Sequence, residues 1–155
     1  VGSEMCIRDS GKCVKLKWPN DLIYESKKIG GILVETENFE DKFLVVLGIG
    51  INLKVTPNEP HWGDLDENLN DEEKKLTFVR KLAWEVSKLE NYSDENWQSD
   101  WLANCVHMNS KIKIASSNEE LFFQGIDHTG AALLKNTSGK VFAYQESSLS
   151  VLNLY

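Results

Sequence analysis

Three short stretches combine charged or amide side chains with turn residues or glycines, and together they could form a site for an anionic ligand. Residues 17–21 read KWPND, a lysine followed by a proline turn that presents an amide and a carboxylate. Residues 28–32 read KIGGI, and residues 48–52 read GIGIN, where glycines thin an apolar run that ends in an asparagine. An ammonium can offset negative charge that gathers on a substrate, and a carboxylate can take or orient a proton.

Each stretch also has a purely structural explanation. Asp21 is a common turn residue, Lys28 fits a solvated lysine in a hairpin, and Asn52 fits the end of a strand. The pair Gly30-Gly31 is harder to explain in this way, because a glycine inside a strand weakens it by roughly 1 kcal/mol relative to alanine. We expect these glycines to let a ligand lie against the strand.

Composition limits the class of protein. The 155 residues suffice for one domain, or for one domain with a small satellite, and 41% are hydrophobic and 26% charged, as in globular proteins. The net charge of −7 argues against non-specific nucleic-acid binding as the main activity, and no apolar run reaches the ~18 residues of a membrane span. Three scattered cysteines predict reduced thiols and a cytoplasmic location, and no cysteine and histidine have the spacing of a zinc site.

The first ten residues, VGSEMCIRDS, fit neither a signal peptide nor a regular strand or helix. The part MCIRDS resembles the translation of a common sequencing adapter, so we expect residues 1–10 to be an artefact of sequence assembly. A genuine, disordered N-terminal tail is the alternative. The fold is therefore predicted from residue 11 onward.

The N-terminal half predicts an antiparallel meander. Residues 14–18 alternate apolar side chains with lysines, which is the period of a half-buried strand. After the turn at 19–21, further strands are predicted over 29–35 and 43–53, separated by a polar break. The run 43–53 is continuously apolar, so we expect a central strand that is covered on both faces.

Two helices are expected next. Residues 54–69 hold two prolines and many acids and predict a long loop. Asn70 and Glu73 have the spacing of a capping box, which begins an amphipathic helix that ends near Asn91. Ser93 is placed to cap a second helix. Three tryptophans on these helices are expected in the core: Trp84, Trp97 and Trp101.

The C-terminal part changes to short strands separated by turn residues, which is typical of a small barrel. We place the boundary between the two parts near residues 107–110. The predicted strands are 111–115, 121–126, 131–135, 141–144 and 148–152.

Taken as a set, the motifs KWPND, KKIGGILVE and LGIGINL resemble the catalytic domain of biotin–protein ligases, and FFQGID with GAALL resembles the SH3-like domain of that family. The resemblance covers residues 11–155 and is strongest through residue 52. It implies an α+β fold: an antiparallel or mixed sheet with packed helices, as a truncated class II synthetase-like ligase core, over 11–107, and a small SH3-like β-barrel over 108–155.

The family condenses biotin with ATP to biotinyl-5′-adenylate and pyrophosphate, and then transfers biotin to a lysine of a biotin carboxyl carrier domain of a carboxylase. By resemblance, Lys28 matches the lysine that contacts the biotin carboxylate and the adenylate phosphate. Gly30 and Gly31 would let the ureido ring and its tail approach the strand. Asp21 matches the carboxylate beside the acceptor lysine, whose proton it could take or whose amine it could orient.

The resemblance also implies the residues that contact ATP. Asn20 and Asn52 match positions near the phosphates and Mg²⁺, with no direct metal ligand assigned. Lys17 could add positive charge toward the phosphates, although its place in the alternation also fits a solvent-facing lysine. Trp62, in the loop 54–69, could stack on adenine or anchor the loop.

Members of the family carry a glycine- and arginine-rich loop upstream of KWPND, and this chain has no such stretch. We therefore expect this polypeptide alone to make no biotinyl-adenylate. Two alternatives stay open: a non-catalytic module that docks carrier domains, and a relative of the lipoate–protein ligases. The joint presence of Asn20, Asp21, Lys28 and Asn52 favours a ligase. A homodimer paired along a sheet edge is left open.

Overall fold

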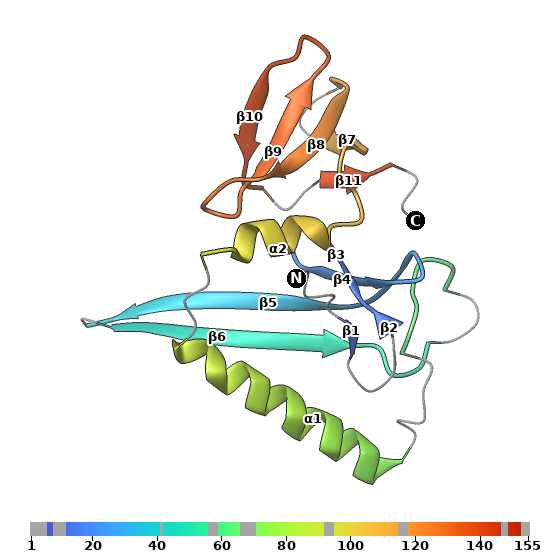
Figure 1. Ribbon diagram of the computed structural model, residues 1–155, viewed down its shortest axis with the longest axis vertical. Helices are drawn as coiled ribbons and strands as arrows, with labels where there is room; N and C mark the ends of the chain where they lie inside the picture. The colour runs from blue at the N-terminus through green and yellow to red at the C-terminus, as the bar shows by residue number, and fades with distance from the viewer. Residues whose placement is uncertain are drawn as a thin grey trace.

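The computed structural model describes residues 6–7, 12–40, 42–55, 59–65, 71–91, 95–114, 118–146 and 149–152. Besides a two-stranded sheet of β1 and β2, the described part has two larger β-sheets. Figure 1 shows α2 between these two sheets and α1 along one face of a long hairpin. Both sheets are antiparallel. The α+β class predicted from the sequence is confirmed.

The first sheet, called the site sheet below, has the strand order β3-β4-β5-β6. Its strands are β3 (Lys15–Lys17), β4 (Asp21–Tyr24), β5 (Lys27–Phe39) and β6 (Lys42–Ile51). Each strand pairs with the next one in sequence, so the predicted meander is confirmed. The polar break expected before β6 is short, because β5 runs to Phe39 and the chain turns at Glu40, whose φ is 52°.

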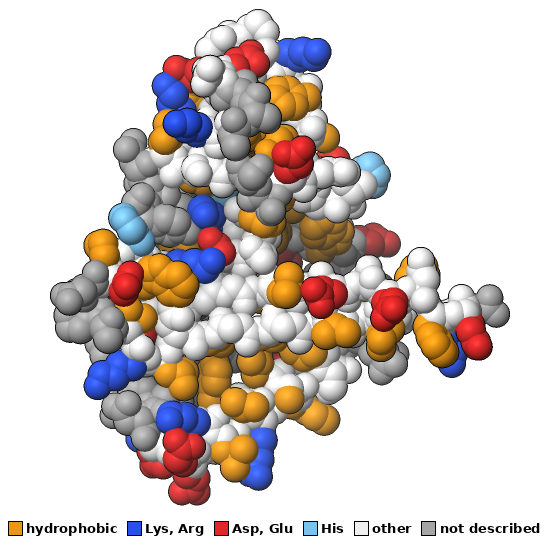
Figure 2. All heavy atoms as spheres, turned by 180° about the vertical axis from the view of Figure 1, so that it is seen from behind, with side chains coloured by type: hydrophobic (Ala, Val, Ile, Leu, Met, Phe, Trp, Pro, Cys, Tyr) orange, Lys and Arg blue, Asp and Glu red, His pale blue; other side chains and the backbone are white. Residues whose placement is uncertain are grey.

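The prediction that residues 43–53 form a central strand covered on both faces is wrong. The strand β6 lies at the edge of the site sheet, and the side chain of Phe43 is 77% exposed. A continuous apolar run indicates burial only where another layer covers it, and the β6 side chains that line the hollow beside α1 are Ile49 and Ile51. The part of the hairpin beyond this cover, residues 33–46, is called the distal hairpin, and Figure 2 shows exposed apolar side chains along it.

Helix α1 (Glu72–Ser87) begins at the N-cap Asp71, whose carboxylate accepts a hydrogen bond from the Glu73 backbone N–H at 2.9 Å. The 3₁₀ turn η1 (Lys88–Asn91) ends it at the predicted place. The expected cap Asn70 lies outside the described residues.

Helix α2 (Trp97–Ala103) begins after the N-cap Asn96, and the expected cap Ser93 lies outside the described residues. Trp101 packs against the core of the second sheet, as predicted. The same prediction is wrong for Trp84 and Trp97, which are 65% and 40% exposed. Helical periodicity places these rings on a helix face, but it does not determine which face another element covers.

The second sheet, called the C-terminal sheet below, has the order β10-β9-β8-β7-β11. Its bounds are β7 (Lys111–Ile114), β8 (Leu121–Ile126), β9 (Ala132–Asn136), β10 (Val141–Tyr144) and β11 (Leu149–Val151). All five predicted strands are confirmed, and each observed boundary lies within one residue of the predicted one. Alternate side chains of β7, β8 and β11 are buried in one cluster, and Phe123, Leu121 and Leu134 are fully buried there. Closure into an SH3-like barrel stays a prediction.

The N-terminal strands and the cysteines bear on the predictions made from the first ten residues and from the composition. Strand β1 (Cys6–Ile7) pairs with β2 (Lys12–Cys13), whereas the rest of the N-terminal ten residues lies outside the described part. Cys13 is disulfide-bonded, so the expectation of reduced thiols is wrong for it, while Cys105 is a free thiol. None of the helices in the described part has the length and apolar character needed to cross a membrane.

Candidate functional site

Three charged side chains of the predicted site meet on the site sheet. The Asp21 carboxylate lies between two ammonium groups, with Lys28 Nζ 2.5 Å from Oδ1 and Lys17 Nζ 3.1 Å from Oδ2. The side chains of Asp21 and Lys17 are only 12% and 11% exposed, and that of Lys28 is 32% exposed. The sequence predicted Asp21 and Lys28 as partners in one site, and the structure brings them into direct contact.

Strand register explains this convergence. Lys17 and Asp21 are directly paired residues of β3 and β4, joined by the turn at residues 18–20, which contains a cis Trp18-Pro19 bond. Paired residues project to the same face of a sheet. The pairing of β4 with β5 shifts between Leu22 and Ile23, so that Lys28 lies opposite Ile23 and its side chain reaches back to Asp21.

The charge state of Asp21 follows from these contacts. Burial is the largest influence and raises the pKa of the carboxyl, but it is outweighed by the hydrogen bonds from Lys28 and Lys17 and by the positive charges of both lysines. The net result is a pKa below the ordinary value of 3.8. The group is therefore a carboxylate at neutral pH, which suits it to hold a cation better than to keep a proton.

A segment of the loop after β6 lies against the start of β5. The Lys28 backbone N–H donates to His61 O at 3.1 Å, and the Gly63 N–H donates to Lys28 O at 2.9 Å. These bonds place the Trp62 ring beside the Lys28 ammonium, with Nζ 5.9 Å from the ring centroid. Trp62 is 47% exposed, so its ring borders the site and is open to solvent.

Asn52 ties the same segments together. Its Nδ2 group donates to Gly63 O at 3.0 Å and to Lys28 O at 3.3 Å, and its backbone N–H donates to Ile29 O at 2.7 Å. The amide N–H₂ thus fixes the loop on the strand. Asn20 lies in the exposed turn before β4, and its backbone carbonyl accepts from Ile32 N–H at 2.9 Å.

The two glycines of β5 face different neighbours. A Cβ on Gly30 would collide with the carbonyl oxygen of Gly50, so the backbones of β5 and β6 need a glycine here. A Cβ on Gly31 would lie 3.3 Å from Asn20 O and 3.8 Å from Asp21 Oδ1, on the side of the carboxylate. A close backbone neighbour thus accounts for Gly30, and contact of either glycine with a ligand stays a prediction.

Residues of the second half of the chain are hydrogen-bonded to β3 and to the turn after it, and the sequence did not predict these contacts. Leu16 N–H donates to Asn104 O at 2.9 Å, and Val106 N–H donates to Leu16 O at 3.0 Å. The Trp18 indole N–H donates to Gly130 O at 2.9 Å, and its ring belongs to the core of the C-terminal sheet. The alternation of residues 14–18 predicts a buried Trp18, but no local signal names its distant partners.

His107 is a second supporting residue that the sequence did not single out. It is fully buried, with its ring centroid 4.2 Å from that of Phe123, and its Nδ1 lies 3.3 Å from Cys105 Sγ. Burial and then the positive charge of Lys17 lower the pKa of His107 to about 4. At neutral pH the ring is therefore uncharged.

The donor set does not fit a protein-held metal ion. Within the described ranges, no three His, Cys, Asp or Glu side chains group closely enough to hold a metal. Asp21 is the carboxylate of the site, and both its oxygens are taken by lysines.

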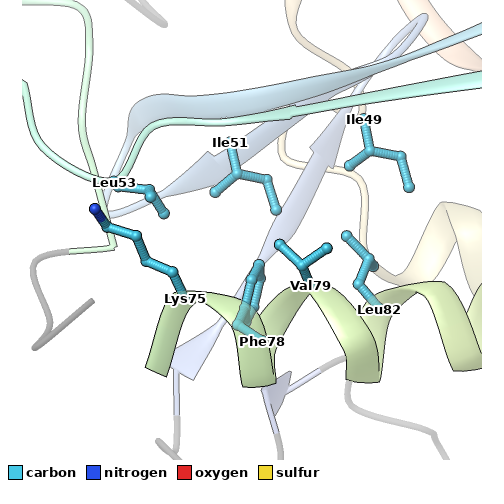
Figure 3. Close-up of a pocket in the computed structure, with 7 residues that line it drawn as sticks. All are labelled: Ile49, Ile51, Leu53, Lys75, Phe78, Val79 and Leu82. Atoms are coloured by element: carbon cyan, nitrogen blue, oxygen red, sulfur yellow. The ribbon is translucent and has the colours of Figure 1, made fainter. Parts of the chain in front are cut away.

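A separate apolar hollow lies between β6 and α1 (Figure 3). Side chains of Ile49, Ile51 and Leu53 face Phe78, Val79 and Leu82 across it, with Lys75 at one end. Ile51 is paired with Gly30, and Asp21 is paired with the next residue, Gly31. Because successive residues of a strand project to opposite faces, this hollow opens on the face opposite to the charged site.

Known proteins resemble this chain in sequence. A model of the biotin/lipoate A/B protein ligase family matches residues 4–52. The bifunctional ligase/repressor BirA of Escherichia coli is 32% identical over 133 residues, which are 79% of this chain and 41% of that protein. The biotin–[acetyl-CoA-carboxylase] ligase of Paracoccus denitrificans is 27% identical over 139 residues, which are 81% of this chain and 58% of that protein.

The fold agrees with these relatives. The apo biotin protein ligase of Aquifex aeolicus matches with a TM-score of 0.68 at 20% identity, over 93% of this chain and 68% of that one. The chain thus spans 41% and 58% of the lengths of the two curated relatives named above. Motifs, relatives and fold agree, and together they support a place for this chain in the biotin–protein ligase family.

Proposed function

We propose that this chain carries part of the active site of a ligase that activates biotin with ATP and attaches it to a lysine of a carrier protein. In the first step, a carboxylate oxygen of biotin forms a bond to the α-phosphorus of ATP, and the bond to pyrophosphate breaks. Lys28 is the cation at this step. It is the more exposed of the two lysines on Asp21, so its ammonium can turn toward an incoming carboxylate or phosphate.

In the second step, the amine of the acceptor lysine attacks the acyl carbon of the adenylate, an amide forms, and AMP leaves. The acceptor must lose a proton before it attacks. The lowered pKa of Asp21 makes it a weak base and a strong partner for an ammonium. The geometry supports Asp21 as the group that draws in and orients the acceptor lysine.

The nucleotide contacts are carried over from the family motif onto matching positions. Asn20 and Asn52 would lie near the phosphates, and Trp62 would stack on adenine beside Lys28. The cation–π distance of 5.9 Å between Lys28 and Trp62 supports a site that takes a flat ring next to an anionic group. Lys17 as a phosphate contact stays a prediction, since its described partner is Asp21.

We also propose the division of the chain at residues 107–110, into part of a catalytic domain and a C-terminal domain. Their separate hydrophobic clusters support it: Val14, Ile29 and Leu65 form one, and the C-terminal sheet forms the other. Trp18 is the exception, since it extends from the site sheet into the second cluster.

The single observation that carries the proposal is the Asp21 carboxylate held between Lys17 and Lys28 within the family motifs. The test is biotin-dependent exchange of labelled pyrophosphate into ATP. It is run with this chain and with a chimera in which residues 12–155 replace the aligned region of the E. coli relative. We expect exchange by the chimera, and a loss of about 100-fold or more on Lys28→Ala.

Two controls sharpen this test. Lys54→Ala removes an exposed lysine of the loop and should leave exchange unchanged. Lipoate in place of biotin decides between the two acids that the matching family model covers. A chimera that folds but exchanges with neither acid would contradict the proposal, and docking of a carrier protein without exchange would favour a non-catalytic module.

A further inference from the structure

The two lysines on Asp21 differ in ways that give them different tasks. Lys17 is paired with Asp21 across β3 and β4, and its side chain is 11% exposed. Lys28 reaches Asp21 from beyond the register shift, is 32% exposed, and has the half-exposed Trp62 ring beside it. Lys17 is therefore held in place by the sheet, while Lys28 borders the solvent-accessible side of the site.

The geometry points to Lys17 as a positioning residue, which keeps the Asp21 carboxylate charged and in place when Lys28 turns away to a substrate carboxylate or phosphate. The inference rests on the proposed function for the identity of that substrate. The cost of leaving a buried carboxylate without a cation does not depend on which substrate is bound. A carboxylate that is 12% exposed and loses one of two cations would be left with an uncompensated burial cost unless the other cation stayed.

The groups around Asp21 are consistent with this division. Lys17 contributes from β3, Lys28 from β5, and the buried His107 is uncharged at neutral pH. The charge of Lys17 lowers the pKa of both Asp21 and His107. No step of the proposed reaction needs Lys17 to touch the substrate.

The departure of Lys28 can be imitated by Lys28→Met, which removes the ammonium and keeps an unbranched side chain. The ionisation of Asp21 is then followed in this chain by NMR of the ¹³C-labelled side-chain carboxyl as a function of pH. The comparison is between Lys28→Met and the double variant Lys17→Met/Lys28→Met. We expect the Asp21 midpoint to move to higher pH in the double variant, because burial then acts without the positive charge of either lysine.

Matched variants separate charge from packing. Lys15→Met makes the same change two residues earlier in β3 and should leave the midpoint unchanged. Lys17→Arg on the Lys28→Met background keeps the charge and should keep the midpoint low. Where the double methionine variant does not fold, Lys17→Gln replaces it, since it removes the charge but keeps a polar group. Equal midpoints with and without the Lys17 charge would overturn the inference.

A second measurement links Lys17 to the reaction. In the chimera, Lys17→Met should leave the concentration dependence of biotin in the exchange reaction within about twofold, whereas the acid limb of carrier biotinylation should move to higher pH. If the unsubstituted chimera lacks exchange, the proposed function fails while the NMR comparison still decides the role of Lys17. If exchange is present and the acid limb does not move, the positioning role fails alone.

Discussion

The C-terminal sheet and the distal hairpin are both rich in apolar residues, but only the first of them buries these residues. In β7, β8 and β11 every second side chain enters one cluster, where Phe123 and Leu134 have no exposed surface. In the distal hairpin, side chains of the same types on both faces remain more than half exposed. Apolar composition therefore predicts a strand in both regions, whereas its burial depends on which other elements lie against it.

The largest expected effect would come from truncating a side chain in each region. Phe123→Ala should lower the free energy of unfolding by about 3–5 kcal/mol, because it leaves a cavity in a fully buried cluster. Phe43→Ala should change it by less than about 0.5 kcal/mol, because the ring is 77% exposed. Urea unfolding measures both. A comparable loss for the two variants would show that the distal hairpin is covered in solution.

A second experiment compares two glycines of the hairpin itself. Gly30→Ala should cost about 1–3 kcal/mol, since the new methyl group meets the Gly50 carbonyl and the two backbones must separate. Gly48→Ala is the control, because its methyl group would make only an ordinary contact with Leu33 at 3.7 Å. Thermal unfolding of both variants is the measurement. Equal stabilities would mean that the strands do not approach as closely as described.

The third prediction concerns Trp18, which joins the C-terminal sheet to the site sheet. Trp18→Phe keeps an aromatic ring in the C-terminal cluster but removes the hydrogen bond to Gly130 O, so we expect a loss of about 1–2 kcal/mol. Trp97→Phe changes an exposed tryptophan on α2 in the same way and should have almost no effect. Urea unfolding, with the indole N–H proton followed by NMR, would check both. An unprotected Trp18 indole proton in the parent chain would contradict the bond.

The smallest effect is expected from the charge of Asp21, and it depends on pH. The pKa of Asp21 is lowered in the folded chain, so its ionised form contributes stability above the unfolded value of 3.8, which is lost as the pH falls through the folded value. Asp21→Asn should therefore be destabilising by about 1 kcal/mol near pH 7 and by less near pH 3. Unfolding midpoints at the two pH values are the measurement. Glu37→Gln, at an exposed position of β5, is a control for the loss of one carboxylate.

Local patterns predicted the parts of the fold that local rules determine. Period-two alternation and turn residues gave β7 to β11 and the meander of the site sheet. The edge position of β6 and the exposure of Trp84 were missed, because alternation and helical period contain no information about the covering layer. The N-cap was predicted within one residue, since capping depends on neighbouring side chains only.

The candidate site was predictable in its members but not in its contacts. Asp21 and Lys28 stand out because a turn and a glycine pair surround them, and the structure pairs their charges, while their role in a site stays a prediction. The contact of Lys17 with Asp21 could not be read from an alternation that equally fits a solvent-facing lysine. The hydrogen bond of Trp18 to Gly130 and the effect of Lys17 on the pKa of His107 involve residues that lie far away in the sequence. These residues approach the site sheet only in the folded chain.

The attachment of residues 16–18 to both sheets has a mechanical consequence. Leu16 is hydrogen-bonded to the segment at 104–106, and the Trp18 ring is part of the C-terminal cluster. Asp21, the first residue of β4 in the site sheet, follows Trp18 by three residues. A hinge motion between the site sheet and the C-terminal sheet would have to break the contacts of residues 16–18 with one of the two sheets. Any movement of the C-terminal sheet therefore displaces the turn that precedes Asp21. A substitution at Gly130, which is far away in the sequence, would act directly on this turn through the hydrogen bond from Trp18.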